Sequence, residues 1–332
     1  MKIYINSTSA ITPQQSFDKE LYLKDWASQE GAYLKALEPV YKDIINPRLL
    51  RRMSRIIKMG VATSLTALKE AGVEQPGAII VGTGLGCIQD TEKFLADIVT
   101  SEEGILSPTA FIQSTHNTVA GQIALLLGCN EDNFTYVNRG HSFENALMDG
   151  VLRIKEGNNH ILVAGADEMT EEVAAIIKAM NYDQVDIWGE GASAFVLSSG
   201  SQESSVELRG VSALNHLSEA EVSEELIQFL NAHELTPADI DAVIVGVNKE
   251  DDSYLKAVKE VIPDAAMANF KRVTGEYFTA VAYGYQLGVN ALLTESISGQ
   301  LIIEKGKKDS FKNILVYNHY FGFNHSFGLL SK

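Results

Sequence analysis

The sequence predicts a large α/β protein built on parallel sheets, on three observations. Short apolar strands alternate with amphipathic helices along nearly the whole chain, the pattern of parallel α/β units. Each half repeats a buried strand that runs into a polar or glycine turn, which hints at internal duplication. A Ser/Gly/Gln-rich stretch, Ser198–Ser205, is the best candidate for a crossover. We therefore expect an N-terminal half over residues 1–200 and a C-terminal half over 205–332, packed as one compact unit.

In the N-terminal half, strands are expected where short apolar runs meet turns. These strands are Lys2–Ile5, Ala78–Val81, Phe134–Val137, Ile161–Ala164 and a run that ends at Leu197. Helices are expected where apolar residues recur every three or four positions. They are a long helix over Arg48–Ala71, an apolar helix within Ser107–Cys129, and a helix over about Ser142–Glu156.

The C-terminal half shows the same alternation of apolar strands and helical patterns. The expected strands are Val206–Val211, Ala242–Val245, a short strand ending at Phe270, Ile314–Tyr317 and Phe327–Leu330. The expected helices are Ser218–His233, Lys256–Ile262 and a long run over Gly275–Ser298.

Composition narrows the function class. The chain has 332 residues, of which 45% are hydrophobic and 21% charged, which suits a soluble protein with a large core. A net charge of −16 argues against nucleic-acid or anionic-membrane binding. Two cysteines, Cys87 and Cys129, form no disulfide framework, and no apolar run approaches the ~18 residues of a membrane span. We therefore expect a cytoplasmic protein.

No cofactor or metal is expected. The glycine-rich turn Gly82–Cys87 places its third glycine one position early for a dinucleotide fingerprint. Cys87 is predicted to be a small buried residue of that turn rather than a nucleophile. The seven histidines show no spacing typical of metal ligands.

The turn Asn138–Gly140, between a strand and a helix, is the place to look for chemistry. A side chain there would sit at a helix N-terminus, whose free N–H groups stabilise a thiolate or an oxyanion. Gly140 offers no side chain.

The helix expected after Pro47 begins with basic residues and has no acid before Glu70. These residues are Arg48, Arg51, Arg52, Arg55 and Lys58. In so acidic a chain they form either a solvated helix face or a docking patch for an acidic partner.

Taken together, six segments resemble the β-ketoacyl synthases of the thiolase superfamily, in the order of that family. The segments are RRMSR (Arg51–Arg55), VGTGLG (Val81–Gly86), SPTAFIQSTHNTVAGQIALLLG (Ser107–Gly128), KEGNNHILVAGADE (Lys155–Glu168), GEGASAFVL (Gly189–Leu197) and FGFNHSFG (Phe321–Gly328). The resemblance implies a thiolase-like α/β fold of two duplicated α/β/α/β/α halves with mixed five-stranded sheets. It also implies a dimer that receives acyl chains from an acyl carrier protein.

The resemblance further implies a catalytic cysteine, two histidines and a supporting lysine, and these positions differ here. Gly140 stands at the cysteine position, Asn248 nearest the first histidine, and Glu276 at the second. Lys271 is retained. Glycine cannot carry an acyl group, and an ionised glutamate would repel an oxyanion. His141 would take the nucleophile position only after a one-residue slip.

The leading hypothesis is a non-condensing subunit similar to the chain-length factors of ketosynthase heterodimers, acting in fatty acid, polyene or polyketide synthesis. Its partners would be an active ketosynthase, or itself as a dimer, and an acyl carrier protein. Arg51, Arg52 and Arg55 are the candidates for carrier docking. The vacant catalytic space is expected to be filled by aromatic residues, of which the candidates are Phe143, Tyr277, Phe278, Tyr320, Phe321 and Phe323.

Two alternatives remain open at this point. One is an acyltransferase or malonyl decarboxylase, because decarboxylation needs no nucleophile if an oxyanion hole survives. It would use His141 or Lys271, with His116, His319 and His325 as further candidates. The other is a non-catalytic scaffold that binds an acyl carrier protein.

Overall fold

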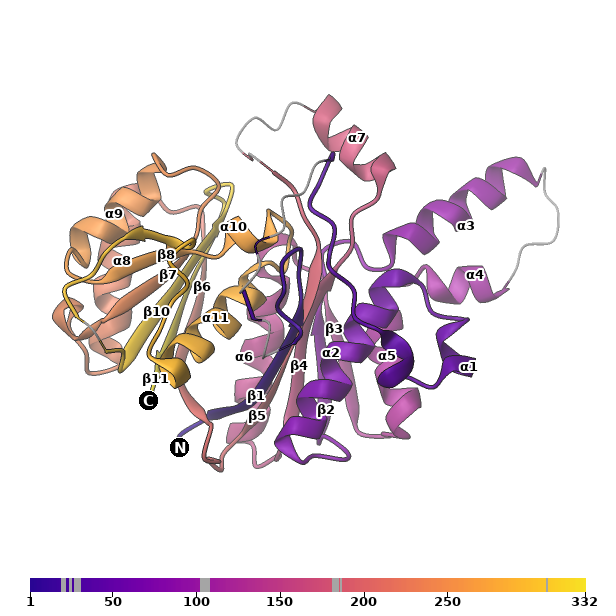
Figure 1. Cartoon of the computed structure of the whole chain (residues 1–332), viewed down its shortest axis with the longest axis horizontal. Coiled ribbons are helices and arrows are strands. Elements are labelled where there is room, and N and C mark those ends of the chain that lie inside the picture. Colours follow the sequence, from indigo (N-terminus) through magenta and orange to yellow (C-terminus); the bar gives the residue numbers. More distant parts are fainter. Residues whose placement is uncertain are drawn as a thin grey trace.

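The computed structural model describes residues 1–18, 22–23, 26, 31–101, 108–180, 185, 187–308 and 310–332. Its core is a mixed sheet in the order β3-β2-β4-β5-β1-β6-β11-β10-β7-β8-β9 (Figure 1). The strands of the first half are β1 (Tyr4–Ile11), β2 (Ala78–Gly82), β3 (Asp132–Tyr136), β4 (Ile161–Asp167) and β5 (Gly191–Ser198). Those of the second are β6 (Val206–Asn215), β7 (Ala242–Gly246), β8 (Ala266–Asn269), β9 (Ile302–Glu304), β10 (Asn313–Tyr320) and β11 (Asn324–Ser331).

The helices lie on both faces of this sheet. In the first half they are α1 (Pro47–Leu50), α2 (Arg55–Ala71), α3 (Ile88–Thr100), α4 (Pro108–Gln113), α5 (Thr118–Leu127), α6 (Ser142–Lys155) and α7 (Glu171–Ala179). In the second they are α8 (Glu219–Ala232), α9 (Ser253–Val261), α10 (Lys271–Thr274) and α11 (Val281–Thr294). Short 3₁₀ turns are η1 (Tyr41–Asp43), η2 (Arg139–His141) and η3 (Pro237–Asp239).

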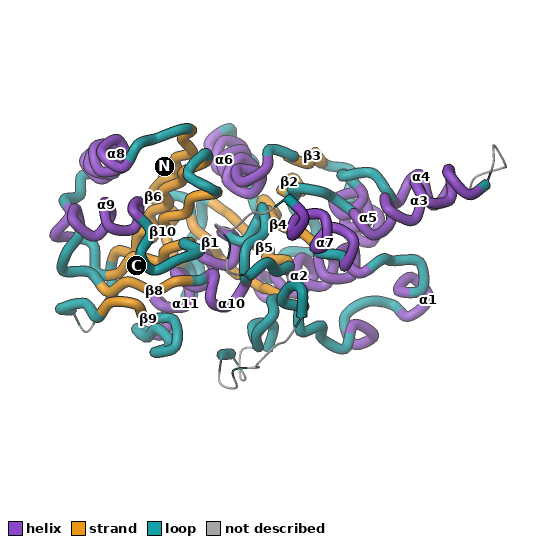
Figure 2. Tube along the Cα trace, turned by 90° about the horizontal axis from the view of Figure 1, so that it is seen from above, coloured by secondary structure: helices purple, strands orange, loops and turns teal. Residues whose placement is uncertain are grey.

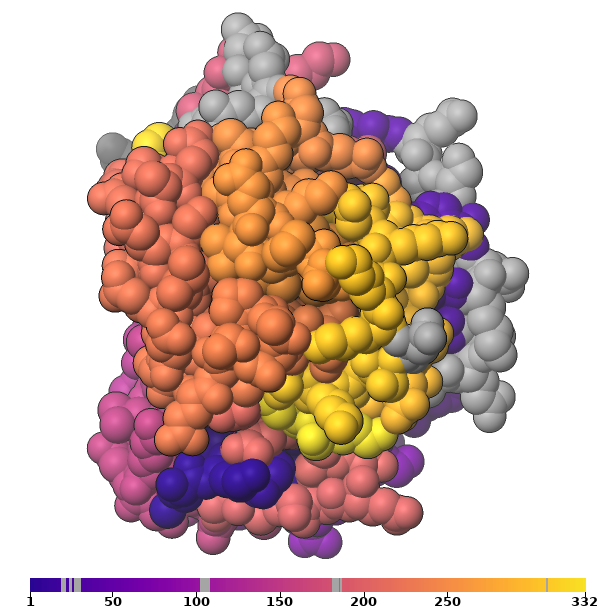
Figure 3. All heavy atoms as spheres, turned by 90° about the vertical axis from the view of Figure 1, so that its left-hand side faces the viewer, coloured from indigo at the N-terminus to yellow at the C-terminus, as the bar shows by residue number. Residues whose placement is uncertain are grey.

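The two halves repeat one strand topology. In the first, β2 is parallel to β3 and β4, and β5 is antiparallel to β4 and β1. In the second, β7 is parallel to β8 and β10, and β11 is antiparallel to β10 and β6. The five strands of the first half and the six of the second are joined where β1 pairs with β6 at Tyr4–Glu207 and Ile5–Val206. Figure 3 shows the indigo N-terminal residues lying against the second half at this junction.

Apolar packing arranges the elements in five layers, because each sheet face buries its own set of side chains. The middle layer holds α6 and α11, whose Phe143, Leu147, Tyr285 and Leu287 share one core with strands of both halves. On the outer face of the first half, α2 and α5 cover the sheet through Ile57 and Ile123, among others. On the outer face of the second, α8 and α9 pack through residues such as Leu226 and Val258 (Figure 2).

The prediction of one long helix over Arg48–Ala71 is wrong, because this segment forms two helices, α1 and α2. Arg51 to Ser54 link the two, and Ser54 takes an extended conformation at the start of α2. The helix predicted over Gly275–Ser298 is also too long, since α11 begins only at Val281. Gly275 has φ +65° and ψ −168°, a conformation open essentially to glycine alone, so no helix can run through it.

Two further expectations need correction. The first strand extends to Ile11, well beyond the predicted Lys2–Ile5, because its residues pair with β5 along their length. The apolar helix predicted within Ser107–Cys129 is two helices, α4 and α5, and Ser107 itself lies outside the described residues. Within the described part of the chain, no helix is long and apolar enough to cross a membrane.

Candidate functional site

The turn at Gly140 is closed by its own polar groups. The Ser142 hydroxyl donates to the Arg139 carbonyl at 2.8 Å and accepts from the Asn138 N–H at 2.9 Å. Both hydrogen-bonding roles of this hydroxyl are therefore used in shaping the turn into α6. Ser142 is fully buried and is not placed to act as a nucleophile.

The space that a side chain at position 140 would need is filled by an aromatic ring. A Cβ atom placed on Gly140 would lie 2.4 Å from Tyr320 Cβ, 2.8 Å from Tyr320 Cγ and 3.0 Å from Asn324 Oδ1. Tyr320 comes from the end of β10, on the far half of the chain. Any residue larger than glycine at this turn, cysteine included, would require Tyr320 to move.

Tyr320 is supported by a second ring, that of Phe278. The two ring centroids are 5.1 Å apart. Phe278 in turn packs on Gly84, where an added Cβ would fall 2.1 Å from the Phe278 ring. The glycine of the VGTGLG segment therefore makes room for an aromatic stack that reaches from β2 to Gly140.

The other aromatic candidates are spread over three environments. Phe143 and Tyr277 are buried in the central core, with Phe143 packed on Phe195 and Tyr285. Phe321 lies edge-on to Tyr320 at 4.5 Å and faces Trp188 at 6.0 Å. Phe323 is 57% exposed. Of the candidate set, Tyr320 is the residue whose atoms occupy the position that Gly140 leaves open, and Phe278 packs against Tyr320.

The positions that stand for the two histidines meet in one buried cluster with Lys271. The Lys271 ammonium donates to Glu276 Oε2 at 2.7 Å, and Asn248 Nδ2 donates to the same oxygen at 2.8 Å. A further bond runs from Lys271 Nζ to the His319 carbonyl at 3.1 Å. Glu276 Oε2 therefore binds one hydrogen from each neighbour, which ties Lys271 and Asn248 to the same acid.

Two contacts hold the buried His141 ring in place. Its Nε2 lies 3.0 Å from the His325 carbonyl, and its Nδ1 faces Asn324 Nδ2 at 3.5 Å. Burial lowers the pKa of the His141 ring, more than its hydrogen bond to the backbone raises it. His116, by contrast, is exposed between α4 and α5.

The acids of two family-like segments have a structural role that the sequence did not reveal. The buried Asp167 carboxylate accepts from Gly84 N at 2.7 Å and from Thr279 N at 2.9 Å, so it joins β4 to the glycine turn and to the second half. Glu190 accepts from Arg55, Ala36 N and Met169 N. Both acids hold backbone in place; neither faces the Gly140 turn.

Glu144 is a buried acid that sequence reasoning missed. It lies on α6, is fully buried, and accepts from the Ser326 hydroxyl at 2.7 Å. Within the described part of the chain, its Oε2 has no hydrogen-bond partner, and neither has Oδ1 of the nearby buried Asn318. Burial raises the pKa of Glu144 to about 7, although Ser326 and Lys271 act in the opposite direction. A polar residue on the inward face of α6 was the only available signal.

The candidate docking arginines are not equivalent. Arg51 and Arg52 are exposed in the link before α2 and line an open hollow with Lys93, Thr109 and Gln113. Arg55 is instead held by the buried Glu190 and by Glu38. Arg51 and Arg52 therefore face solvent, whereas Arg55 supports the fold.

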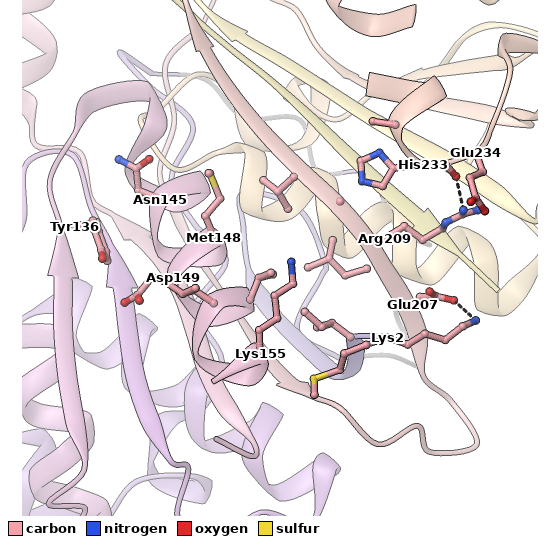
Figure 4. Close-up of a pocket in the computed structure, with 18 residues that line it drawn as sticks. Lys2, Tyr136, Asn145, Met148, Asp149, Lys155, Glu207, Arg209, His233 and Glu234 are labelled. Atoms are coloured by element: carbon pink, nitrogen blue, oxygen red, sulfur yellow. Dashed lines mark hydrogen bonds and ion pairs between the residues drawn. The ribbon is translucent and has the colours of Figure 1, made fainter. Parts of the chain in front are cut away.

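The other features that could support chemistry are the Cys87 thiol, groups of metal-ligating side chains and a cleft elsewhere on the molecule. Burial and the neighbouring Glu168 raise the pKa of the Cys87 thiol, which suppresses its thiolate form. Among the described residues, no group of three or more histidine, cysteine, aspartate or glutamate side chains is arranged to hold a metal ion. A large cleft of about 1020 Å³ lies elsewhere, between α6 and β6, with Met148, Lys155 and Arg209 on its walls (Figure 4).

Comparison with known proteins decides the family. Residues 24–239 match the model of the β-ketoacyl synthase N-terminal domain, which is more than half of the chain. The chain belongs to the β-ketoacyl synthase family. A search of curated protein sequences gave no match. The family predicted from the six segments is thereby confirmed.

Solved ketosynthase-like structures share the fold over the full chain. The ishigamide ketosynthase/chain length factor superposes with a TM-score of 0.79 at 16% identity, covering 100% of this chain and 99% of the other. A β-ketoacyl synthase from Burkholderia phymatum gives 0.75 at 14% identity, covering 100% and 99%. The ketosynthase ApeO in complex with its chain length factor ApeC, from Xenorhabdus doucetiae, gives 0.75 at 15% identity, covering 99% and 98%. The predicted thiolase-like α/β fold is confirmed.

Proposed function

We propose that this protein is a non-condensing, chain-length-factor-type member of the β-ketoacyl synthase family, working in the cytoplasm beside an active ketosynthase in fatty acid, polyene or polyketide synthesis. The observation that carries the proposal is the occupation of the nucleophile position: Tyr320 fills the space at Gly140. A subunit that keeps the fold while its nucleophile position is filled can still shape the assembly and bind a partner. We further propose that residues 201–204 divide the two halves, 1–200 and 205–332.

The state of the other catalytic positions supports the same reading. Glu276 neutralises the Lys271 ammonium and also takes the Asn248 amide, so the group that would stabilise an enolate is already paired. An acyltransferase or decarboxylase that used His141 or Lys271 would first have to break these buried bonds. The geometry therefore favours the non-condensing role over both enzyme alternatives.

A partner surface is supported by the hairpin of α3 and α4, which projects from the body of the molecule (Figure 1). Neither helix has a fully buried residue. Five of its large apolar side chains are 42–80% exposed; they are Leu95, Ile98, Val99, Phe111 and Ile112. Because monomers rarely leave such a patch open to water, a second ketosynthase-like subunit is the occupant we propose. Complexes of this kind occur among the structural neighbours, as in the ApeO–ApeC pair.

An acyl carrier protein is the second partner we propose. Exposed Arg51, Arg52 and Lys93 around one hollow offer positive charge to an acidic carrier. A type II carrier protein bound to its ketosynthase is known among the structural neighbours. The net charge of −16 of this subunit works against tight docking to it alone, so we expect the heterodimer to bind the carrier more tightly than this chain does.

Co-expression with a candidate ketosynthase tests the proposal. We expect a heterodimer by size-exclusion chromatography and native mass spectrometry, and condensation of malonyl units only when the partner is present. The purified subunit alone should take up no radiolabelled acyl group. Covalent acylation of the isolated chain, at His141 for example, or condensation by its homodimer would overturn the proposal.

Surface variants with a matched control test the α3–α4 hairpin as the interface. Phe111→Asp should abolish heterodimer formation, because it puts a charge into an apolar contact. Ile227→Asp alters a similarly exposed apolar residue, 42% exposed on α8, and should leave assembly unchanged. Equal loss in both variants, or in neither, would remove this hairpin as the interface.

A further inference from the structure

The tip of the β10–β11 hairpin, which carries Tyr320, is held by two histidine side chains. His319 and His325 face each other across the hairpin, with their rings stacked at 5.8 Å. The N–H of Gly322, at the tip, donates to His319 Nδ1 at 3.1 Å. The carbonyl of the same Gly322 lies 3.0 Å from His325 Nε2. Both polar backbone groups of one turn residue are therefore bound by imidazole nitrogens.

These partners fix where each ring carries its proton. A backbone N–H can only donate, so His319 Nδ1 is bare and its Nε2 carries the hydrogen that it donates to Asp252 Oδ2 at 3.0 Å. A backbone carbonyl can only accept, so His325 Nε2 carries the hydrogen. The bare Nδ1 of His325 then accepts from the Tyr317 hydroxyl at 3.1 Å.

His141 ties the same turn to the helix that follows Gly140. Its Nε2 lies 3.0 Å from the His325 carbonyl, so this nitrogen also carries the hydrogen. Its Nδ1 faces the Asn324 amide nitrogen, which donates as well to Asn215 Oδ1 at 2.8 Å. All three histidines thus use the same neutral tautomer, each with one donated and one accepted bond.

A second proton on His325 or His141 would face a donor. On His325 it would point at the Tyr317 hydroxyl, whose own hydrogen would lose its buried acceptor. On His141 it would point at Asn324, whose amide could turn only by giving up its bond to Asn215. In both cases the broken contact belongs to the hairpin that positions Tyr320.

The charged and titratable groups around the three rings do not compensate for such a proton at His325 or His141. They are Asp252, Tyr254 and Tyr317, the more distant Glu219, and Lys271, whose ammonium binds the His319 carbonyl and Glu276. Asp252 is bound to His319 rather than to the other two rings. Burial lowers the pKa of His325 to about 4, more than the Gly322 carbonyl raises it.

We propose that His141, His319 and His325 form a latch that keeps Tyr320 closed over Gly140 while all three rings are neutral, and that adding a proton to His141 or His325 opens the hairpin. The latch explains why an aromatic plug on a two-strand turn stays in one place. It concerns how the site is kept closed, so it can fail while the non-condensing function stands.

Histidine nitrogen NMR tests the closed state. Single His→Gln variants assign the signals of the ¹⁵N-labelled full-length protein. At about pH 7.5 we expect His141, His319 and His325 all to show the neutral Nε2–H form. An Nδ1–H tautomer or a charged ring at His141 or His325 would overturn the proposal.

Trp188 fluorescence tests the opening, because its ring faces Phe321 at 6.0 Å beside Tyr320. In a Trp26→Phe background it is the single tryptophan. We expect a red shift of emission as pH falls from about 6.5 to about 4, with unchanged far-UV circular dichroism. The pair His141→Gln/His325→Gln keeps both Nε2 donors without titrating and should lose the shift.

The control for the double variant is His116→Gln, which should keep the shift at its original midpoint. If the double variant does not fold, hydrogen exchange at Gly322 in the wild-type protein replaces it. That amide should lose its protection over the same pH range in which the His325 nitrogen signal titrates. A charged His325 ring with an unshifted Trp188 emission, or with a protected Gly322 amide, would contradict the latch.

Discussion

Lys271 and Glu276 form an ion pair at 2.7 Å whose side chains are only 3% and 2% exposed. The resemblance to the family places Glu276 where a catalytic histidine would be expected. In this structure the Lys271 ammonium is bound to that glutamate, five residues away, inside the protein.

Breaking this pair from one side should be costly. Glu276→Leu leaves a buried ammonium without its counter-ion, and we expect a loss of about 3–5 kcal/mol in the free energy of unfolding. The double variant Lys271→Met/Glu276→Leu should recover at least half of that loss, since no charge is left buried. Urea denaturation measures both. If the double variant is as unstable as the sum of the two single variants, the pair is not coupled as the geometry indicates.

Placing a cysteine at residue 140 should not by itself give a thiol that reacts with reagents in solution. In Gly140→Cys the new side chain collides with Tyr320, at a cost of about 1–3 kcal/mol, and stays covered. In Gly140→Cys/Tyr320→Ser the ring is gone and the thiol should react with a maleimide. Wild type, whose Cys87 and Cys129 are both buried, gives the background. Rapid labelling of the single variant would mean that Tyr320 does not close the position.

Stability should depend on pH through Glu144. Its pKa is raised to about 7 in the folded protein, so the fold favours the protonated form. That contribution is complete below the ordinary glutamate pKa of ~4.5 and is lost as pH rises through about 7. Glu144→Gln should therefore be more stable than wild type at pH about 8, by about 2–3 kcal/mol.

The glutamine has a second reason to stabilise the fold. Its amide nitrogen would supply a donor where Glu144 Oε2 and Asn318 Oδ1 both lack one. Thermal unfolding from about pH 5 to about pH 8 measures the difference, with Glu224→Gln, at an exposed position on α8, as control. A gap between wild type and Glu144→Gln that does not widen with pH would count against a raised pKa.

The three arginines of the RRMSR segment should separate by experiment. Arg51→Glu/Arg52→Glu changes exposed residues and should alter the free energy of unfolding by less than ~0.5 kcal/mol. Carrier binding by the heterodimer should fall about tenfold. Arg55→Ala should lower the free energy of unfolding and leave carrier binding unchanged, because it removes the counter-ion of the buried Glu190 carboxylate. Fluorescence anisotropy with a labelled carrier protein reads the binding. Unchanged binding after the double reversal would remove these arginines as a docking patch.

The sequence predicted most of the architecture because strands and helices here follow local patterns. The helix after Gly140 was expected over about Ser142–Glu156 and runs over Ser142–Lys155. The failures lie where backbone geometry overrides propensity: Gly275 adopts a conformation that no helix permits, and four residues before Arg55 break an otherwise helical pattern. Neither feature has a period that a sequence reader can see.

The sequence named candidate site positions but could not predict their contacts. Gly140, Asn248, Lys271 and Glu276 could be named from sequence order, and the structure brings the last three together. That Tyr320 would occupy the place of the missing side chain depends on a packing contact between residues 180 positions apart along the chain. The role of Glu144 likewise depends on Ser326, on the opposite half.

The hydrogen bonds of Asp167 have a consequence for how members of this family can be told apart. Its carboxylate fixes the glycine turn and a loop of the second half, whatever happens at residue 140. The GADE and VGTGLG segments are thus requirements of assembly, and a protein can carry them unchanged after its chemistry is lost. Counting such segments in a genome would overstate the number of condensing enzymes. The positions that can distinguish members of the family are instead those of the candidate site, such as residues 140 and 276.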